Sequence, residues 1–410
     1  MAAAHALCTD HDVTLFEAAP RLGGHARTIT AGKRGDQPVD TGFIVYNRVN
    51  YPNLVGLFEA LDVPVEESDM SFAASLDGGR IEYSLQTLDT LFAQRRNALR
   101  PPFLRMVRDV LRFNARAADA ANDPDQPLRD FVTKMGLGQE FRDWYLGPIS
   151  GAIWSTPSQD VMDFPAQAMV RFFENHALLS HTGQHQWYTV SGGSVEYVRR
   201  LEAHLRGAGV TIRTGAPVAS VRRLPARVEI RAEGAEVEAF DDVVLATHSD
   251  DSLRLLADAD AQETGLLRHI RYQDNHAILH ADPGAMPKRR KVWAAWNYRE
   301  EPGNARGQLG LTYWMNRLQN IPEDDPLFVT LNATTAIREE LIYDQKTFRH
   351  PVYDLEMMAA VEGVRAMNGH RNTWFCGAWM RNGFHEDGFA SAVEAVAAMR
   401  ARRPQGIAAA

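Results

Sequence analysis

The chain has 410 residues, with 45% hydrophobic and 23% charged residues, which is ordinary for a globular protein long enough for two domains. Its formal net charge of -8 at pH 7 argues against a nucleic-acid-binding protein, which normally carries a basic surface. No apolar run approaches the ~18 residues that span a bilayer. The two cysteines, Cys8 and Cys376, lie far apart in sequence. We therefore predict a cytoplasmic protein without a disulfide framework, a zinc site or any other metal site.

The first half of the chain begins with a predicted helix end at 2–7, followed by a strand at 11–17 (HDVTLFE) that is rich in β-branched and aromatic residues. Helical periodicity dominates residues 46–190, most clearly at 103–118 and 163–179. A strand-rich block then runs from about 209 to 247, with the sequences VTIRT, VASVRRL, RVEIRAE and DDVVLAT.

The last part of the chain is mixed, with a predicted strand at 328–335 (FVTLNATT), another at 373–376 and a helix at 390–402. Segments typical of one nucleotide-binding domain thus occur at the start, the middle and the end. We predict an α/β fold with two domains. A discontinuous Rossmann-like domain comprises residues 1–45, 191–250 and 367–410, and a mixed α+β domain comprises residues 46–190 and 251–366.

The strand at 11–17 ends in Glu17 and is followed by R-x-G-G, with Arg21, Gly23 and Gly24. In a dinucleotide-binding fold, an acid at a strand end accepts hydrogen bonds from the ribose hydroxyls. Paired glycines let backbone N–H groups approach a diphosphate, and an arginine adds positive charge. Glu17 alone would be an ordinary exposed carboxylate, but the combined spacing favours a nucleotide site.

The pattern E-A-x-x-R-x-G-G-x-x-x-T over 17–28 resembles the second FAD motif of the flavin amine oxidases and phytoene-desaturase-like enzymes. This resemblance implies an FAD-binding protein. In it Glu17 would bind the ribose, while Arg21, Gly23 and Gly24 would lie near the pyrophosphate and flavin. Some members have an arginine directly after the paired glycines, where this chain has His25.

The family also has a strand and a G-x-G-x-x-G loop about 20 residues before the ribose acid. Counting back from Glu17 places the last of these glycines just before Met1, so that 2–7 would be the remainder of the phosphate-binding helix. Two explanations are open: an internal methionine read as the start, or a true truncation that weakens FAD binding. We expect the former.

Two further motifs support the resemblance. Asp40 and Gly42 form a D-x-G turn like one that lies near the flavin in related enzymes, although an ordinary Asx turn would look the same. Val218 occupies the place of a strand valine whose backbone meets adenine in the family. Residues 242–248 (DVVLATH) resemble the strand that returns beneath the cofactor. Both strands are equally compatible with ordinary parallel core strands.

The C-terminal motif combines Gly377 with the segment G-F-H-E-D-G-F-A-S at 383–391. A glycine turn that opens a small-residue helix presents free N–H groups to anionic ligand atoms. The resemblance implies contacts of Gly377, Glu386, Asp387, Gly388 and Ser391 with the pyrophosphate, ribityl chain and flavin. An alternative role for Glu386 and Asp387 is capping of the helix N-terminus.

Three further segments of the sequence resemble a bacterial subgroup that includes desaturases of 10-methyl fatty acids on the route to furan fatty acids. These segments are YLGPISGAIWSTP, WYTVSGGS and GFHEDG. This resemblance implies a lipid acyl substrate and hydride transfer from an activated C–H bond to flavin N5. Oxygen or an electron carrier would then reoxidise the flavin. Candidates for base or orienting group are His25, His385 and Glu386.

Two basic stretches, Arg95–Arg116 and Lys288–Trp296, combine arginine and lysine with apolar side chains. Phe103, Val107, Val110 and Leu111 are expected to share one helical face. Such patterns suit contact with anionic lipid head groups, so that we expect peripheral membrane contact here; the alternative is a solvated face with paired charges. Six tryptophans are candidates for lining an apolar tunnel or for the core: Trp144, Trp154, Trp187, Trp293, Trp296 and Trp314.

Two other functions remain open at this point. An amine oxidase would share all the FAD motifs but would need an aromatic cage around an uncharged amine. A non-catalytic protein that binds lipid or a partner without flavin is the second alternative.

Overall fold

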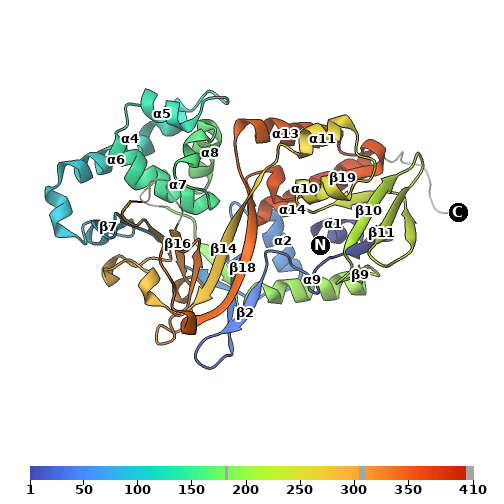
Figure 1. Cartoon of the computed structure of the whole chain (residues 1–410), viewed down its shortest axis with the longest axis horizontal. Helices are drawn as coiled ribbons and strands as arrows, with labels where there is room; N and C mark the ends of the chain where they lie inside the picture. The colour runs from blue at the N-terminus through green and yellow to red at the C-terminus, as the bar shows by residue number, and fades with distance from the viewer. Residues whose placement is uncertain (181–182, 304–309, 403–410) are drawn as a thin grey trace.

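The computed structural model describes residues 1–180, 183–303 and 310–402. Short stretches of the predicted domain segments, 181–182, 304–309 and 403–410, thus lie outside the described residues. Figure 1 shows an elongated molecule, with the chain start and the C-terminal helix at one end and a layer of helices at the other. The order of elements is mixed α/β, as the sequence predicts. The domain boundaries remain a prediction.

The part that contains the start of the chain, here called the cofactor half, holds four short strands in two parallel pairs. The strands are β1 (Thr14–Phe16) with β9 (Thr211–Arg213), and β13 (Val243–Leu245) with β19 (Thr373–Phe375). Three helices pack beside them: α1 (Ala2–Leu7), α9 (Val195–Gly207) and α14 (His385–Arg402). Leu7 of α1 shares an apolar cluster with Val396 and Met399 of α14, so that the first and last helices lie together.

An antiparallel three-stranded sheet extends from the cofactor half, with β10 (Val218–Arg223), β11 (Val228–Ala232) and β12 (Val237–Phe240). Val218 pairs with Ala232 in the antiparallel ladder between β10 and β11. The reading of this segment as a parallel core strand is therefore wrong. The alternating burial along β10 fits a sheet with one solvated face.

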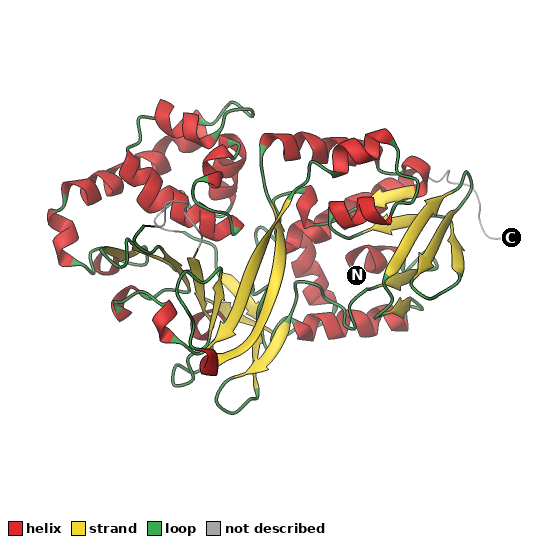
Figure 2. Ribbon diagram, viewed as in Figure 1, coloured by secondary structure: helices red, strands yellow, loops and turns green. Residues whose placement is uncertain are grey.

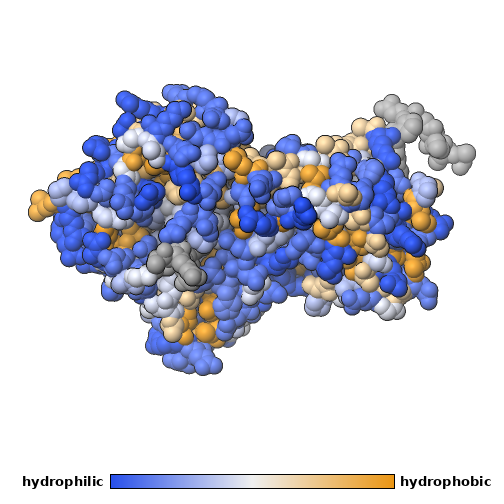
Figure 3. Space-filling model, turned by 45° about the horizontal axis from the view of Figure 1, so that its top comes forward, coloured by the Kyte–Doolittle hydropathy of each residue, from blue (hydrophilic) through white to orange (hydrophobic). Residues whose placement is uncertain are grey.

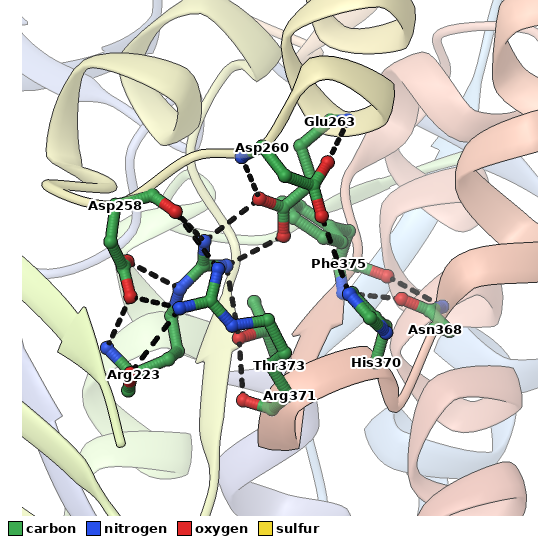
Figure 4. A network of polar contacts seen from close by, with 9 residues as sticks. All are labelled: Arg223, Asp258, Asp260, Glu263, Asn368, His370, Arg371, Thr373 and Phe375. Carbon is green, nitrogen blue, oxygen red and sulfur yellow. Dashed lines mark hydrogen bonds and ion pairs between the residues drawn. The ribbon is translucent and has the colours of Figure 1, made fainter. Parts of the chain in front are cut away.

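A buried ion network anchors this sheet to the helices behind it (Figure 4). The Arg223 side chain has no exposed surface and donates to both carboxylate oxygens of Glu263, at 2.6 and 2.8 Å. It also bonds Asp258 at 2.7 Å, and Arg371 bonds the same carboxylate from the other side. Glu263 lies on α11 (Ala261–Leu267), Asp258 lies in the loop after α10 (Ser249–Leu255), and Arg371 lies in the turn after α13 (Leu355–Met367). Charges here serve to hold elements together.

The centre of the molecule is a seven-stranded mixed sheet, seen in yellow in Figure 2. Its strands, in spatial order, are β18 (Ile342–Pro351), β14 (Tyr272–His280), β17 (Phe328–Leu331), β16 (Gly310–Trp314), β15 (Trp296–Arg299), β6 (Phe72–Leu76) and β7 (Ile81–Ser84). Only the β15–β6 pair is parallel among these described strands. The two long strands β14 and β18 reach from this sheet toward the cofactor half (Figure 1).

A helical layer covers one end of this sheet (Figure 2). Its helices are α3 (Leu88–Leu91), α4 (Pro101–Ala120), α5 (Leu128–Lys134), α6 (Gln139–Phe141), α7 (Gly147–Trp154) and α8 (Ala166–Asn175), with a short helix, η1 (Arg95–Leu99), before α4. Phe103, Met106 and Phe113 form the buried face of α4. Leu111, expected on that face, is half-exposed, because the 3.6-residue period places it about 80° away from Phe103.

Three smaller elements connect the halves: the hairpin β2 (Thr28–Ala31) and β3 (Gln37–Asp40), the sheet β4 (Val45–Asn47), β8 (Trp187–Val190) and β5 (Val65–Ser68), and α2 (Pro52–Ala60). Arg27, just before β2, donates two hydrogen bonds to Asp344 of β18, at 2.6 and 3.0 Å. A short helix, α12 (Met315–Leu318), follows β16. No helix among the described residues is both long and apolar enough to span a membrane.

Candidate active site

A cavity of about 600 Å³ lies between the cofactor half and the central sheet. Eight of the residues singled out from the sequence line it: Glu17, Gly23, Gly24, His25, Gly42, Gly377, His385 and Gly388. Six do not: Arg21, Asp40, Val218, Glu386, Asp387 and Ser391. The chain thus brings together motifs that are up to 371 residues apart, Glu17 and Gly388, at one end of a single cavity.

The turn that follows β1 is built around two glycines with left-handed backbone angles. Gly23 has a φ of 104° and Gly24 a φ of 55°, values that side chains disfavour. The Arg21 guanidinium donates to the carbonyl oxygens of Leu22, Gly24 and Ala26, at 3.1, 2.8 and 3.1 Å. Arg21 therefore fixes the turn from behind, while Gly24 leaves open space toward the cavity.

Gly42 lies against this turn. A Cβ at Gly42 would overlap the carbonyl oxygen of His25, and Phe43 N–H donates to that same oxygen at 2.9 Å. The D-x-G motif is thus needed for a close backbone approach, which keeps His25 on the cavity wall.

Glu17 follows β1 directly and its carboxylate lies at the cavity wall. One oxygen accepts from the Ala19 N–H at 2.9 Å, and the other has no hydrogen bond within the described part of the chain. A carboxylate with a free oxygen at the end of a parallel strand fits the ribose hydroxyls of a dinucleotide. The arrangement therefore fits the adenosine part of FAD.

The C-terminal motif supplies a second small-residue wall. Gly377 and Gly388 line the cavity, while Ser391 lies behind them. The Ser391 hydroxyl accepts from Gly377 N–H at 2.9 Å and lies 3.0 to 3.1 Å from the carbonyl oxygens of Gly388 and Gly377. Ser391 thus ties the turn to α14, whose N-terminal end faces the cavity, a favourable position for anionic groups.

Three of the four acidic residues expected near FAD, Asp40, Glu386 and Asp387, are instead held inside the protein. Asp40 accepts from Ser194 N–H at 2.9 Å and from the Ser194 and Thr28 hydroxyls at 2.7 and 2.6 Å. Burial raises the pKa of Asp40, and that of Asp387, to about 6. Asp387 accepts from Phe384 N–H at 2.9 Å. Both residues therefore fix loops around the site, and neither reaches the cavity.

Glu386 is also occupied elsewhere. Its carboxylate accepts from the Asn53 N–H and side-chain amide, at 3.0 and 2.6 Å, and from Leu54 N–H at 2.9 Å. It thereby caps α2, a neighbouring helix, and it is 6% exposed. These contacts do not support the predicted catalytic role for Glu386, because no oxygen of the carboxylate faces the cavity without a partner.

Comparison with known proteins agrees with this geometry. A family model described as flavin containing amine oxidoreductase matches residues 1–400. The chain belongs to the flavin-containing amine oxidoreductase family. Members of this family use FAD, and the protein is an FAD-dependent oxidoreductase. Glu17, the Gly23–Gly24 turn, Gly377 and Gly388 are the residues of this member that fit the cofactor.

Solved structures of similar fold include a fatty acid isomerase from P. acnes that produces CLA, with a TM-score of 0.67 and 15% identity over 97% of this chain and 95% of the other. A putrescine oxidase double mutant has a TM-score of 0.67 and 16% identity, over 98% and 96%. A reduced UDP-galactopyranose mutase has a TM-score of 0.69 and 14% identity, over 98% and 94%. At these identities the likeness shows the fold alone. A search of curated proteins gives no match.

In this oxidoreductase the end of the cavity opposite the cofactor residues is apolar. We call it the substrate end. One face of the central sheet contributes Phe72, Trp296, Tyr313, Leu331 and Phe348, and Tyr272 joins them from the start of β14. Helices α7 and α8 complete the wall with Ile149, Ile153, Trp154 and Phe172. Trp296 and Tyr313 are a cross-strand pair whose rings stand perpendicular at 5.0 Å.

Three histidines form the border between the two ends of the cavity. The His25 ring centroid lies 5.7 Å from that of His350 and 6.3 Å from that of His248. Burial, with the neighbouring histidines, lowers the pKa of His25 to about 3, and burial lowers that of His350 to about 4. His25 is therefore neutral at pH 7 and a weak proton acceptor, which favours an orienting role.

His385 has a similar environment. Its ring stacks on Phe43 at 4.0 Å and its Nε2 lies 2.6 Å from the Tyr197 hydroxyl. Burial lowers the pKa of His385 to about 4. The side chain is thus held in one orientation at the cavity wall, again as a neutral group.

The sequence alone did not single out three polar residues of the wall: His248, His350 and Tyr353. The sequence could have indicated His248 as a site residue, because it lies shortly after the carboxyl end of β13, where ligands gather in parallel sheets. His350 and Tyr353 carry no local signal, since only the pairing of β14 with β18 brings them to the cavity. Of the six tryptophans considered, Trp154, Trp187 and Trp296 line it.

His248 also lies near Asp250 and Asp251, with candidate ligand atoms within 4.8 Å of one another. Arg349 pairs with Asp250 and lies 3.6 Å from Asp251. Because this arginine already supplies the positive charge, we assign no metal to the group.

Proposed function

We propose that this oxidoreductase is a lipid desaturase that acts on methyl-branched, unsaturated fatty acyl chains. The observation that carries the proposal is the composition of the substrate end, where sheet and helices present aliphatic and aromatic side chains on both sides. Burial of each CH₂ of a chain contributes roughly 0.8 kcal/mol, so a long acyl chain gains much from such a wall. The sequence resemblance to 10-methyl fatty acid desaturases points to the same substrate class.

The charges of the wall also favour an uncharged substrate. Glu17, at the cofactor end, is the one carboxylate among the described lining residues. Arg349, the one arginine among them, is paired with Asp250. A protonated amine would find no carboxylate at the substrate end, where burying a charge without a partner is costly.

The proposed reaction removes a hydride and a proton from adjacent carbons and leaves a C=C bond. FAD, when bound, supplies the hydride acceptor, and oxygen or an electron carrier takes the electrons afterwards. Glu17 and the Gly23–Gly24 turn hold the adenosine and pyrophosphate. The aliphatic and aromatic side chains of the substrate end orient the acyl chain, and the neutral His25 and His350 border it. The apolar wall keeps water from the reacting carbons, so the proton passes first to a neutral histidine of the border, His25 or His350, and from there to solvent.

The test is anaerobic mixing of the FAD-loaded protein with phospholipids that carry a methyl-branched monounsaturated chain. We expect loss of the oxidised-flavin absorbance and a product two mass units lighter. Trp296→Ala should slow this reduction strongly, whereas Trp293→Ala, on the other face of the sheet, should leave it unchanged. Reduction by polyamines with peroxide release, and none by lipid, would identify an amine oxidase instead.

The cofactor contact has its own test. Glu17→Ala should lower the retained flavin by about tenfold, because a hydrogen bond to a charged group contributes roughly 1.5–3 kcal/mol. Glu236→Ala, an exposed acid in the β11–β12 turn, is the matched control. Unchanged flavin content in Glu17→Ala would overturn the ribose assignment. A protein that retains no flavin in any form would support the non-catalytic alternative.

A further inference from the structure

One end of the helical layer exposes large apolar side chains. Ten such side chains are exposed in the described structure, and five of them fall between residues 85 and 111: Leu85, Leu88, Leu99, Leu104 and Leu111. Leu88 is 78% exposed and Leu99 is 85% exposed. Figure 3 shows apolar groups projecting at the left edge, the end where Figure 1 shows the segment between β7 and α4. Half of the exposed large apolar side chains of the described structure thus gather in this one segment, and apolar side chains that gather on a surface mark interaction sites.

Basic side chains surround these leucines. Along α4, Leu104, Arg108, Leu111 and Arg112 recur at a spacing of three or four residues and therefore share one exposed face. Arg95 and Lys291 flank Leu88 by sharing the carboxylate of Asp89. We call this region the leucine–arginine surface.

Several of these cations lack a neutralising acid. Arg96 and Arg100 donate to the carbonyl oxygen of Arg80, at 3.0 and 3.2 Å, and Arg112 donates to that of Gly136 at 3.3 Å. None of the three forms an ion pair within the described part of the chain. Positive charge thus remains available for an anionic partner.

The two tryptophans of the basic stretch 288–296 are not part of this surface. Trp296 lines the cavity, and Trp293 packs on Trp314 and Phe328 with ring centroids 5.5 and 5.9 Å apart. The apolar component is made of leucines, which carry no polar group that has to be satisfied.

We propose that the leucine–arginine surface docks on an anionic lipid bilayer, with the leucines inserted among the acyl chains and the arginines at the phosphate level. Single projecting leucines separated by arginines fit the boundary between head groups and acyl chains. A protein partner fits less well, because the exposed apolar side chains of this surface are all leucines, whereas protein interfaces are enriched in aromatic side chains and leucine is under-represented among their hot spots.

Docking here would bring the substrate end near the bilayer. Phe113, on the inner face of α4, contacts Phe173 of α8 with ring centroids 6.1 Å apart, and the adjacent Phe172 lines the cavity. One layer of helices thus separates the docked face from the apolar wall. The docking itself does not depend on the proposed reaction, and only its purpose rests on that function.

The test is co-sedimentation of the full chain with phosphatidylcholine vesicles, with and without phosphatidylglycerol. We expect binding to the anionic vesicles that weakens with salt. Two double variants should each lower the partition coefficient by about tenfold or more. They are Leu88→Ser/Leu99→Ser and Arg96→Glu/Arg100→Glu. Controls with equal changes elsewhere are Val237→Ser/Met358→Ser and Arg199→Glu/Arg206→Glu, and both should bind like the wild type.

Absence of binding, or binding unaffected by both test variants, would overturn the proposal. Loss with the arginine variant but not with the leucine variant would indicate electrostatic adsorption without insertion of the leucines and would also overturn the proposal. Vesicle binding together with failed lipid oxidation would sustain the docking surface and refute the desaturase function, so the two proposals fail separately.

Discussion

Arg223, in the cofactor half, has no exposed side-chain surface and bonds both oxygens of Glu263, whereas Arg96 and Arg100, in the helical layer, bond only carbonyl oxygens. Arginine side chains thus serve different purposes in the two regions. In the network around Arg223, the charges are paired and enclosed by β10, α11 and β19 (Figure 4). At the leucine–arginine surface they stay hydrated, and their removal should affect binding more than folding.

The largest difference should appear on breaking the buried pair. Arg223→Met would leave Glu263 as a buried carboxylate without its cation, whereas Asp258 would keep its ion pair with Arg371. We expect a loss of about 3–5 kcal/mol in the free energy of unfolding, the cost of removing one partner of a buried ion pair. Urea unfolding followed by circular dichroism measures it.

Arg105→Met is the matched control for that measurement. Arg105 pairs with Glu140 at the surface of the helical layer, with 47% of its side chain exposed. Such pairs contribute about 0–1 kcal/mol. Equal losses in both variants would show that the two regions do not differ as described.

A moderate effect is expected at Glu386. Glu386→Gln would place an NH₂ group against one of the N–H donors of Asn53 or Leu54. We expect a loss of roughly 1.5–3 kcal/mol in stability, because a charge-assisted cap is removed. Flavin content and the rate of flavin reduction should stay close to wild type. Normal stability with a large loss of rate would restore the catalytic assignment of Glu386.

The smallest effect, per residue, concerns the neutral histidines. His25, His350 and His385 have pKa values of about 3 to 4, below the value near 6.5 of the unfolded chain. The unfolded chain therefore binds more protons below pH 6.5, and stability falls as the pH falls from there toward 4. Each of the three histidines should lower the free energy of unfolding by about 1 kcal/mol as the pH falls from 6.5 to 5.5.

Thermal unfolding at pH 7.5, 6.5 and 5.5 tests this dependence, with His385→Gln as the variant. The variant should lose less stability over this range than the wild type. An identical pH dependence would show that folding does not lower the pKa of His385.

The sequence predicted the cofactor end of the cavity better than the substrate end. Glu17, Gly24, Gly377 and Gly388 follow strands or open a helix, so local pattern and strand order place them. The substrate end depends on the register between distant strands, such as Trp296 opposite Tyr313 and Phe72. Local periodicity contains no information about such pairing. Residues with the chemistry of a site, such as Asp40 and Glu386, instead cap loops and helices, which sequence alone does not distinguish.

The contact between Arg27 and Asp344 has a consequence for biosynthesis. The cavity wall joins residues from the first 45 positions with residues from β18 and α14, near the end of the chain. A nascent chain cannot close this wall until those last elements have left the ribosome, so the complete cavity forms only after synthesis of the chain. Premature termination before β18 would therefore release a chain whose first motif has no partner to close against.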